Sequence, residues 1–298
     1  MVLRDRFPRL SALWLAARPS QLALIGLVYA LGVGMATTDA PAVPWTRVGV
    51  GFAAVLPLAV SIHYANEYAD AETDRLTERT PFSGGSGALE RTGVDRTLLA
   101  RASAGALFVG VTAAGLGWLA SLLSTTATAL LATIAVAGLA YSLPPVALVR
   151  RGVGEVTNAV LGGTLLPLYG VAVVGPVTVE AVLAVVPFTL LVGCNLLATH
   201  WPDREADAAV GKRTLAVRWS PERLRLAYWT LVAAAVLMTA GLTPLLPTAI
   251  IAAGAVALPP LLWGGVVLTR QRSPFPAVSA MVLHAGASTV AWWWLALS

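Results

Sequence analysis

Long apolar stretches, separated by short polar segments, dominate the hydrophobic pattern of this chain. A helix needs about 20 mostly apolar residues to cross the hydrocarbon core of a membrane. The pattern therefore predicts nine membrane-spanning helices, with a turn between Ser121 and Thr128 separating the third from the fourth. The predicted spans lie at about 20–36, 47–66, 98–122, 125–142, 154–175, 179–199, 222–242, 245–268 and 275–296.

The composition agrees with a membrane protein. Of the 298 residues, 57% are hydrophobic and only 12% are charged, and the mean hydropathy is +0.75. An ordinary soluble domain is excluded by these values. We expect one transmembrane domain over residues 1–298, with polar loops at about 67–97 and 200–221 capping an active site. The single cysteine, Cys194, excludes a disulfide framework and a cysteine-based metal site.

Basic residues predict the orientation of the spans. Nineteen of the 20 arginines and lysines fall before the first span or after an even-numbered span, and only Arg47 falls on the other side. Cytoplasmic loops carry the excess of basic residues in membrane proteins. The N-terminus and both long polar loops are therefore predicted to be cytoplasmic, in a plasma or inner membrane, and the C-terminus outside. The net charge of +5 belongs to these loops and does not indicate nucleic-acid binding.

Two acidic motifs follow the second and sixth spans. The first places Asn66, Asp70 and Asp74 at intervals of four residues, and the second places Asp203 and Asp207 at the same interval. Residues four apart share one face of a helix, where like charges repel each other and acids at a helix C-terminal end oppose its dipole. An arrangement so unfavourable predicts a missing cation. Oxygen ligands alone, with Glu67 among them, favour Mg²⁺.

The motifs also reveal a weak internal repeat. Each half of the chain has two spans, an acidic loop and two more spans, and Asp70 and Asp74 align with Asp203 and Asp207. Two halves of equal orientation are related by an axis along the membrane normal. We expect two four-helix halves whose motifs face each other across a central cavity, with the ninth span as an addition.

Cations near the motifs predict a phosphate site. Arginine suits bidentate phosphate contacts, and the candidates are Arg79, Arg150, Arg151, Lys212 and Arg213. The Gly/Ser-rich segment from Thr80 to Gly87 is either a backbone cradle for phosphate or a flexible loop. It lacks the Walker pattern, which argues against nucleotide binding.

A membrane protein that binds a diphosphate with Mg²⁺ beside apolar helices suggests transfer of a prenyl chain. Ionisation of an allylic diphosphate leaves a carbocation, which aromatic faces stabilise without attacking it. The aromatic candidates are Tyr64, Tyr68, Tyr141, Tyr169 and Trp201, of which Tyr141 is favoured.

Other polar residues in the apolar runs have simpler interpretations. His63, His200 and His284 have no spacing typical of a metal site and are expected to be hydrogen-bonded histidines. Asn158 and Asn195 either hydrogen-bond between helices or line a polar cavity.

Three motifs in order resemble the UbiA superfamily of intramembrane prenyltransferases. They are Asn66-Glu67-x-x-Asp70-x-x-x-Asp74, the segment from Tyr141 to Pro145 with Arg150-Arg151-Gly152, and Asp203-x-x-x-Asp207 followed by Gly211-Lys212-Arg213-Thr214-Leu215. The resemblance implies nine helices around a lateral, lipid-open cavity with Mg²⁺-bound diphosphate at its cytoplasmic end. Glu67 departs from the aspartate often found there, which weakens the metal role carried over to it.

We expect Mg²⁺-dependent transfer from a polyprenyl diphosphate to an aromatic acceptor, a quinone precursor such as a hydroxynaphthoate or hydroxybenzoate. The metal would be held by Asn66, Glu67, Asp70, Asp74, Asp203 and Asp207, and the diphosphate by Asn66, Arg79, Arg150, Lys212 and Arg213. The alternatives are a terpene synthase that cyclises the prenyl chain, a membrane transporter and a catalytically silent scaffold. A transporter would place its charged residues near the middle of the membrane rather than at its edge.

Overall fold

The computed structural model describes residues 7–38, 40–77, 79, 82 and 84–298. Every regular element among these residues is a helix, and nine helical segments are long and apolar enough to span a membrane. The nine-helix prediction is confirmed. The spans are α3 (Pro19–Thr37), α4 (Trp45–Leu76), α6 (Thr97–Leu119), α7 (Thr125–Ser142), α8 to α9 (Gly154–Val174), α10 (Val179–His200), α13 (Pro221–Gly241), α14 to α15 (Thr248–Val267) and α16 (Phe275–Leu297).

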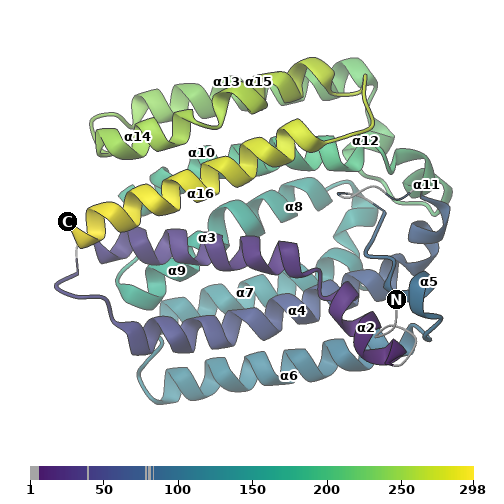
Figure 1. The fold of residues 1–298 in the computed structure, drawn as a ribbon, viewed down its shortest axis with the longest axis horizontal. Helices are drawn as coiled ribbons and strands as arrows, with labels where there is room; N and C mark the ends of the chain where they lie inside the picture. The colour runs from purple at the N-terminus through teal and green to yellow at the C-terminus, as the bar shows by residue number, and fades with distance from the viewer. Residues whose placement is uncertain (1–6, 39, 78, 80–81, 83) are drawn as a thin grey trace.

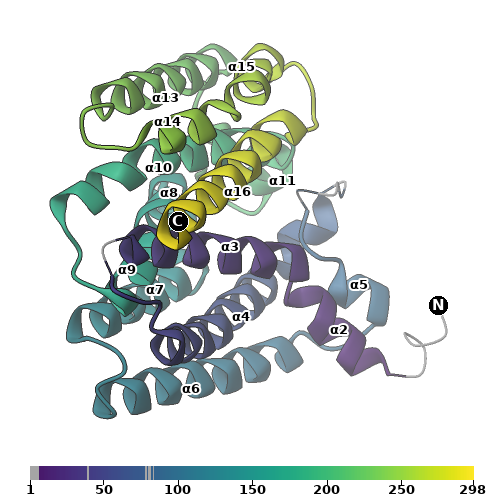
Figure 2. The ribbon, with the colours of Figure 1, turned by 60° about the vertical axis from the view of Figure 1, so that its left-hand side comes forward.

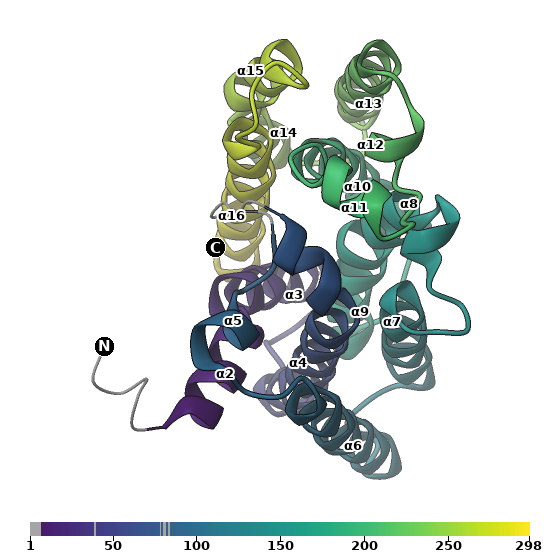
Figure 3. The ribbon, with the colours of Figure 1, turned by 90° about the vertical axis from the view of Figure 1, so that its right-hand side faces the viewer.

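Short helices gather at one end of the bundle. Figure 1 shows α2 (Pro8–Ala16), α5 (Ala88–Thr92), α11 (Arg204–Ala209) and α12 (Leu215–Arg218) at its right-hand end, with the C-terminus at the opposite end. In Figure 3 this end faces the viewer, and α11 and α5 lie over the ends of the long helices. The loops that carry the two acidic motifs therefore share one end of the bundle, as the sequence predicts.

Helices pack within each half of the chain, and helices of the two halves also pack against each other. Helix α4 packs against α6 and α7, while α10 packs against α13, and α13 against α15. The ninth span, expected as an addition, instead packs against α3, α10, α14 and α15, and Figure 2 shows α16 between α3 and α14. Helix α16 therefore contacts both halves, as does the fifth span through α9 against α3.

The apolar surface of the helices faces outward as well as inward. On α6, Phe108 is 72% exposed and Leu119 is 72% exposed. A soluble protein would not leave such a run of large apolar side chains in water, so the exterior fits a lipid environment. Inside, close packing relies on small residues: a Cβ on Gly32 would lie 1.8 Å from the carbonyl oxygen of Pro167, where α3 crosses α9.

Two predicted spans are each built from more than one helix. The fifth consists of α8 (Gly154–Val160), the π-helical turn η2 (Leu161–Leu165) and α9 (Leu166–Val174). The eighth is broken between α14 (Thr248–Ala255) and α15 (Leu258–Val267), because Pro259 and Pro260 cannot donate to the preceding turn of helix. Hydropathy alone does not reveal these breaks, since the residues at each break remain apolar.

The two acidic motifs have different local structures. Helix α4 continues ten residues beyond the predicted apolar limit and ends at Leu76, so Asn66, Asp70 and Asp74 lie on one helical face as predicted. Helix α10, however, ends at His200, and Asp203 is the N-cap residue of the new helix α11. The predicted conflict between acids and the end of a helix dipole therefore does not apply to the second motif, since acids are favourable at a helix N-terminus.

This shared end predicts the sidedness of both acidic loops. In a Cys194→Ala background, cysteines introduced at Asp95 and Ala209 should be labelled by an impermeant thiol reagent only from the cytoplasmic side. A cysteine at Glu180, in the first turn of α10 at the other end of the bundle, is the matched control and should be labelled only from outside. Labelling from outside of the cysteine at position 95 or 209 would contradict the orientation deduced from the basic residues.

Candidate active site

A cavity of about 620 Å³ opens at the end of the bundle that carries the acidic motifs. Eight of the residues predicted for the site line it together: Asn66, Asp70, Asp74, Arg79, Tyr141, Asp203, Asp207 and Lys212. Its deeper walls are apolar and include Ile25, Val55, Ile134, Leu161 and Leu166. The cavity therefore has a charged mouth and a hydrocarbon-like interior, a shape suited to a molecule with an anionic head and an apolar chain.

Lys212 joins the two acidic motifs. Its ammonium lies 2.9 Å from Oδ1 of Asp70 and 3.3 Å from Oδ1 of Asp207, and the side chain is only 7% exposed. Burial alone would lower the pKa of Lys212, but the carboxylates of Asp70 and Asp207 outweigh that effect, so its pKa is raised and the group is charged. Carboxylates from two distant segments thus converge on one cation.

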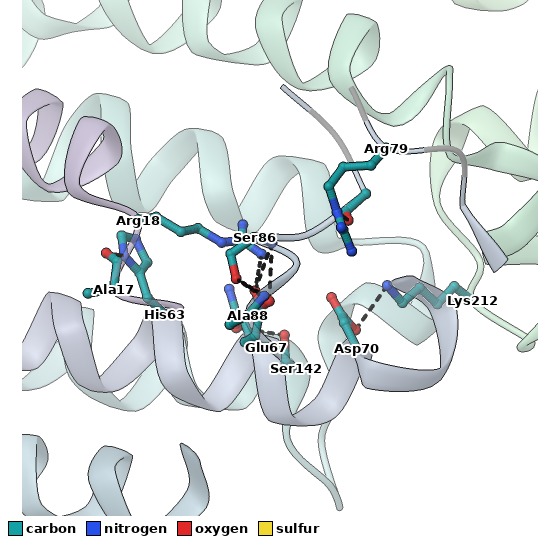
Figure 4. A network of polar contacts seen from close by, with 12 residues as sticks. Ala17, Arg18, His63, Glu67, Asp70, Arg79, Ser86, Ala88, Ser142 and Lys212 are labelled. Carbon is teal, nitrogen blue, oxygen red and sulfur yellow. Dashed lines mark hydrogen bonds and ion pairs between the residues drawn. The ribbon is translucent and has the colours of Figure 1, made fainter. Parts of the chain in front are cut away.

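Glu67 lies outside the cavity wall and binds protein groups instead. It accepts a hydrogen bond from Arg18 Nη2 at 2.8 Å and from the backbone N–H of Ser86 at 3.1 Å, and its carboxylate also accepts the Ser86 hydroxyl. Figure 4 shows Arg18 and Ser86 converging on Glu67, while Lys212 approaches Asp70. The structure therefore gives Glu67 a different environment from the metal-binding one expected from the motif, because Arg18 and Ser86 occupy its carboxylate oxygens.

The Gly/Ser-rich segment is ordered by these contacts where it is described. Residues 80, 81 and 83 lie outside the described part of the chain, but Phe82, Gly84, Gly85 and Ser86 line the cavity. Arg79 donates through Nε to the carbonyl of Gly84 at 3.0 Å and through Nη2 to Glu90 at 2.8 Å. Since Ser86 gives its N–H to Glu67, this N–H is occupied by the protein rather than offered to phosphate.

Three predicted cations, Arg150, Arg151 and Arg213, do not line the cavity. Arg151 is exposed and donates to the carbonyl of Pro145 at 2.9 Å. Arg150 is exposed and donates to the carbonyl of Val210 at 2.8 Å, which ties the segment before α8 to the end of α11. Arg213 is exposed beside buried Lys212 and is not part of the cavity wall. Neighbouring residues along the chain point to opposite sides here, so proximity in sequence did not determine which cation faces the site.

Of the five aromatic candidates, Tyr141 is the one that lines the cavity. Its ring packs against Gly154, where an added Cβ would lie 3.1 Å from Tyr141 Cε2. Tyr64 and Tyr169 donate to backbone carbonyls. Arg96 lies over the ring of Tyr68, and Arg204 lies over the ring of Trp201. These four have packing or hydrogen-bonding roles, as aromatic residues of helix ends often do.

The histidines are partners of protein groups, as the sequence predicts. His63 Nδ1 lies 2.8 Å from the carbonyl of Ala17, and His200 Nδ1 lies 3.1 Å from Glu155. Within the described residues, no three histidine, cysteine or acidic side chains are grouped closely enough to hold a metal ion without rearrangement. The convergence of Asp70 and Asp207 on the Lys212 ammonium nevertheless shows that both motifs can present oxygens to a shared cation.

Sequence reasoning missed two residues of the site. Arg18 lines the cavity and neutralises Glu67, but its position before the first span indicated only membrane orientation. Ser142 lies at the end of α7 and donates to Oδ1 of Asn66 at 2.7 Å, which fixes that amide at the cavity mouth. Ser142 lies within the Tyr141–Pro145 motif, so the sequence does contain a signal for this residue.

Gly85 is predicted to be required for the position of Asp74. A Cβ at Gly85 would lie 1.9 Å from Asp74 Oδ2, and the residue has φ +69°, whereas Gly93 has φ +66° and open space around it. Both Gly→Ala changes should cost about 1–2 kcal/mol of backbone strain, but only Gly85→Ala should also displace the carboxylate. The melting temperature should fall by a similar amount in both variants, and turnover should fall in Gly85→Ala alone. Equal turnover in the two variants would contradict this.

Lys212 is predicted to stabilise the fold before any ligand binds. Lys212→Ala leaves two carboxylates without their cation, so we expect the free energy of unfolding to fall by about 2 kcal/mol. This value is smaller than for a fully buried pair, because Asp70 is partly exposed to solvent. Arg213→Ala changes an exposed neighbour and should stay within about 0.5 kcal/mol of the parent. Chemical or thermal unfolding of ligand-free protein in detergent measures both. Equal stabilities would mean that the ion pairs contribute nothing to the fold.

Comparison with known proteins agrees with this fold. The sequence matches the model of the UbiA prenyltransferase family over residues 26–295. No curated protein matches it significantly. A UbiA homologue from Archaeoglobus fulgidus, solved with GPP and Mg²⁺, superposes with TM-score 0.71 at 16% identity and covers 97% of this chain and 100% of its own.

Two further solved structures share the fold. A digeranylgeranylglyceryl phosphate synthase superposes with TM-score 0.67 at 15% identity, covering 96% of this chain and 99% of its own. The ligand-free UbiA homologue from Aeropyrum pernix K1 gives TM-score 0.66 at 17% identity, covering 90% of this chain and 95% of its own. Since the family match covers most of the sequence and these folds extend over nearly all of it, the chain belongs to the UbiA prenyltransferase family.

Proposed function

We propose that this protein transfers a prenyl chain from an allylic polyprenyl diphosphate to an aromatic acceptor within the membrane. The observation that carries the proposal is the division of the cavity into a charged mouth and an apolar interior. A prenyl diphosphate has the same division. The Archaeoglobus fulgidus homologues were solved with GPP or DMAPP and Mg²⁺, which supports the same class of substrate here.

The residues at the mouth fit Mg²⁺. Asn66, Asp70, Asp74, Asp203 and Asp207 offer only oxygen ligands, the kind that Mg²⁺ prefers. Carboxylates of both motifs already meet at one cation, the Lys212 ammonium. When bound, Mg²⁺ would neutralise the charge that develops on the leaving diphosphate. Glu67 has no direct part in this site, because Arg18 and Ser86 occupy it.

Protein cations assist at the same end. Lys212 and Arg79 line the mouth and would contact the diphosphate oxygens. Lys212 can exchange an Asp70 or Asp207 contact for a phosphate contact when a metal ion supplies the positive charge to the carboxylates. Arg150 would act indirectly, by holding the loop between α11 and α12 through Val210.

Deeper in the cavity, the protein would protect and direct the allylic cation. The bond from C1 to the diphosphate oxygen breaks, and the electron pair leaves with the diphosphate. The Tyr141 ring offers a π face to the positive carbon, and the apolar walls exclude water that would otherwise capture it. A carbon of the acceptor then bonds to C1 and loses its proton, which restores aromaticity.

We further propose that the acceptor is a quinone precursor, such as a hydroxynaphthoate or hydroxybenzoate, and that residues 1–298 act as one transmembrane domain. The loops at about 67–97 and 200–221 would cap the site on the cytoplasmic side of a plasma or inner membrane. Cyclisation of the prenyl chain would use the same mouth, so product analysis separates the two reactions: a prenylated aromatic supports transfer, and a hydrocarbon made from prenyl diphosphate alone supports cyclisation.

The two acidic motifs are predicted to act as one unit. Asp70→Asn and Asp203→Asn should each abolish most turnover, and the double variant should cost little more than either change alone, since residues that act together are non-additive. Prenylation assays with and without chelator measure this. Near-normal turnover in both single variants, or full turnover in chelator, would contradict the mechanism and favour a transporter or scaffold.

Ligand binding gives an independent measurement. Mg²⁺ with a non-ionisable diphosphate analogue should raise the thermal stability of the parent protein by mass action, and should raise it much less for Asp70→Asn. The exposed change Glu72→Gln, two residues further along α4, is the matched control and should keep the parent response. An equal rise in thermal stability in Asp70→Asn would mean that the acidic motif does not take part in diphosphate binding.

A further inference from the structure

Two asparagine side chains line the cavity below its charged mouth. Asn158 comes from α8 and Asn195 from α10. Asn195 is 9% exposed, and its Oδ1 is buried with no hydrogen-bond partner among the described residues. Binding of Mg²⁺ and diphosphate at the mouth does not use this oxygen. A buried carbonyl oxygen without a donor is unfavourable unless a ligand supplies one.

Two polar contacts fix the register of α8 against α10. Glu155 contacts His200 at 3.1 Å near the mouth, and Thr164 hydrogen-bonds to Thr189 at 2.8 Å deeper in the bundle. Between these contacts, Asn158 lies three residues beyond Glu155, and Asn195 lies five residues before His200. The two helices run in opposite directions, so both amides lie at similar depth, about one turn of helix below the mouth.

The helix beside these amides is irregular. The π-helical turn η2 begins at Leu161, three residues after Asn158, and Leu161 and Gly162 both line the cavity. Such turns are rare and often occur at functional sites, because they redirect the side chains on one face of a helix. Asn158 on α8 and Asn195 on α10 therefore line the cavity beside this turn, while Ile25 of α3, Val55 of α4 and Ile134 of α7 give it apolar lining.

We propose that Asn195, with Asn158 beside it, binds a neutral phenolic hydroxyl of the acceptor and so determines acceptor specificity. The proposal rests on the proposed function and names the part of the acceptor that the protein recognises. The free oxygen of Asn195 accepts a hydrogen bond and therefore needs a donor on the ligand. A carboxylate has no donor and would be costly among the apolar walls, whereas a hydroxyl meets both requirements.

This position also suits the reaction. The amides lie about one turn from the mouth, alongside the place where the first carbons of a prenyl chain would follow the diphosphate. A hydroxyl held there keeps the ring beside the allylic carbon, and its oxygen donates electron density to the ring carbons next to it. The apolar lining residues of the cavity are left for the prenyl chain.

The test measures recognition of the hydroxyl itself. Dissociation constants are determined by calorimetry on the full chain in detergent, with Mg²⁺ and a non-ionisable prenyl diphosphate analogue present. The probes are para-hydroxybenzoate and its methoxy counterpart, and a hydroxynaphthoate with its methoxy counterpart. At least one hydroxyl compound should bind the parent about tenfold more tightly than its methyl ether. Asn195→Leu should reduce that ratio to near one while leaving the affinity for the diphosphate analogue unchanged.

Control variants separate recognition from packing. Leu197→Met, a swap of similar volume at a buried residue of α10 that does not line the cavity, should keep the parent ratio. Asn195→Leu should also leave the ligand-free protein equally or more stable, because it removes a buried oxygen without a partner. If Asn195→Leu cannot be purified as folded protein, Asn158→Leu is measured in the same way and should lower the ratio.

Three outcomes would overturn the proposal. They are an unchanged ratio in the asparagine variants, a loss of stability that identifies Asn195 as an interhelical partner, and failure of every hydroxyl probe to bind a parent protein that binds the diphosphate analogue. In the first two of these the proposed function stands, and in the third the proposed quinone-precursor acceptor is lost while diphosphate binding stands. Failure of the parent to bind the diphosphate analogue would instead remove the proposed function, and the inference with it.

Discussion

The fold depends on neutralising carboxylates at the ends of apolar helices. Charged groups in such positions are costly unless a partner is present. Two cations from distant parts of the chain meet this requirement: Lys212 lies between Asp70 and Asp207, and Arg18 contacts Glu67. Each contact joins a loop or helix start to α4. The same constraint that holds the end of the bundle together therefore also assembles the mouth of the cavity.

This arrangement divides the acids of the first motif between two tasks. Asp70 and Asp74 face the cavity, whereas Glu67 faces the loop and holds Ser86 and Arg18. The longer side chain of glutamate suits that second task because it reaches the backbone N–H of Ser86. Gly85 then passes so close to Asp74 that no side chain fits between them. Loop order and carboxylate position are consequently linked.

Irregular helices shape the rest of the cavity. The π-helical turn η2 lies between Asn158 and the apolar wall at Leu166, and polar contacts at Glu155 and Thr164 hold its helix in register with α10. In a membrane, polar groups inside a bundle are few and mostly paired. An amide oxygen left without a partner beside such a turn is therefore informative about the ligand rather than about the packing.

The sequence by itself determined the nine spans, the shared end of the acidic loops and most of the cavity mouth. Apolar length and the four-residue spacing of Asn66, Asp70 and Asp74 are local properties, and local properties can be read along a chain. Only the tertiary structure decided which neighbours enter the cavity: Lys212 but not Arg213, Asp70 but not Glu67, Tyr141 but not Tyr64. These choices depend on how helices and loops distant in sequence pack together, as does the π-helical turn, and hydropathy alone does not show that packing.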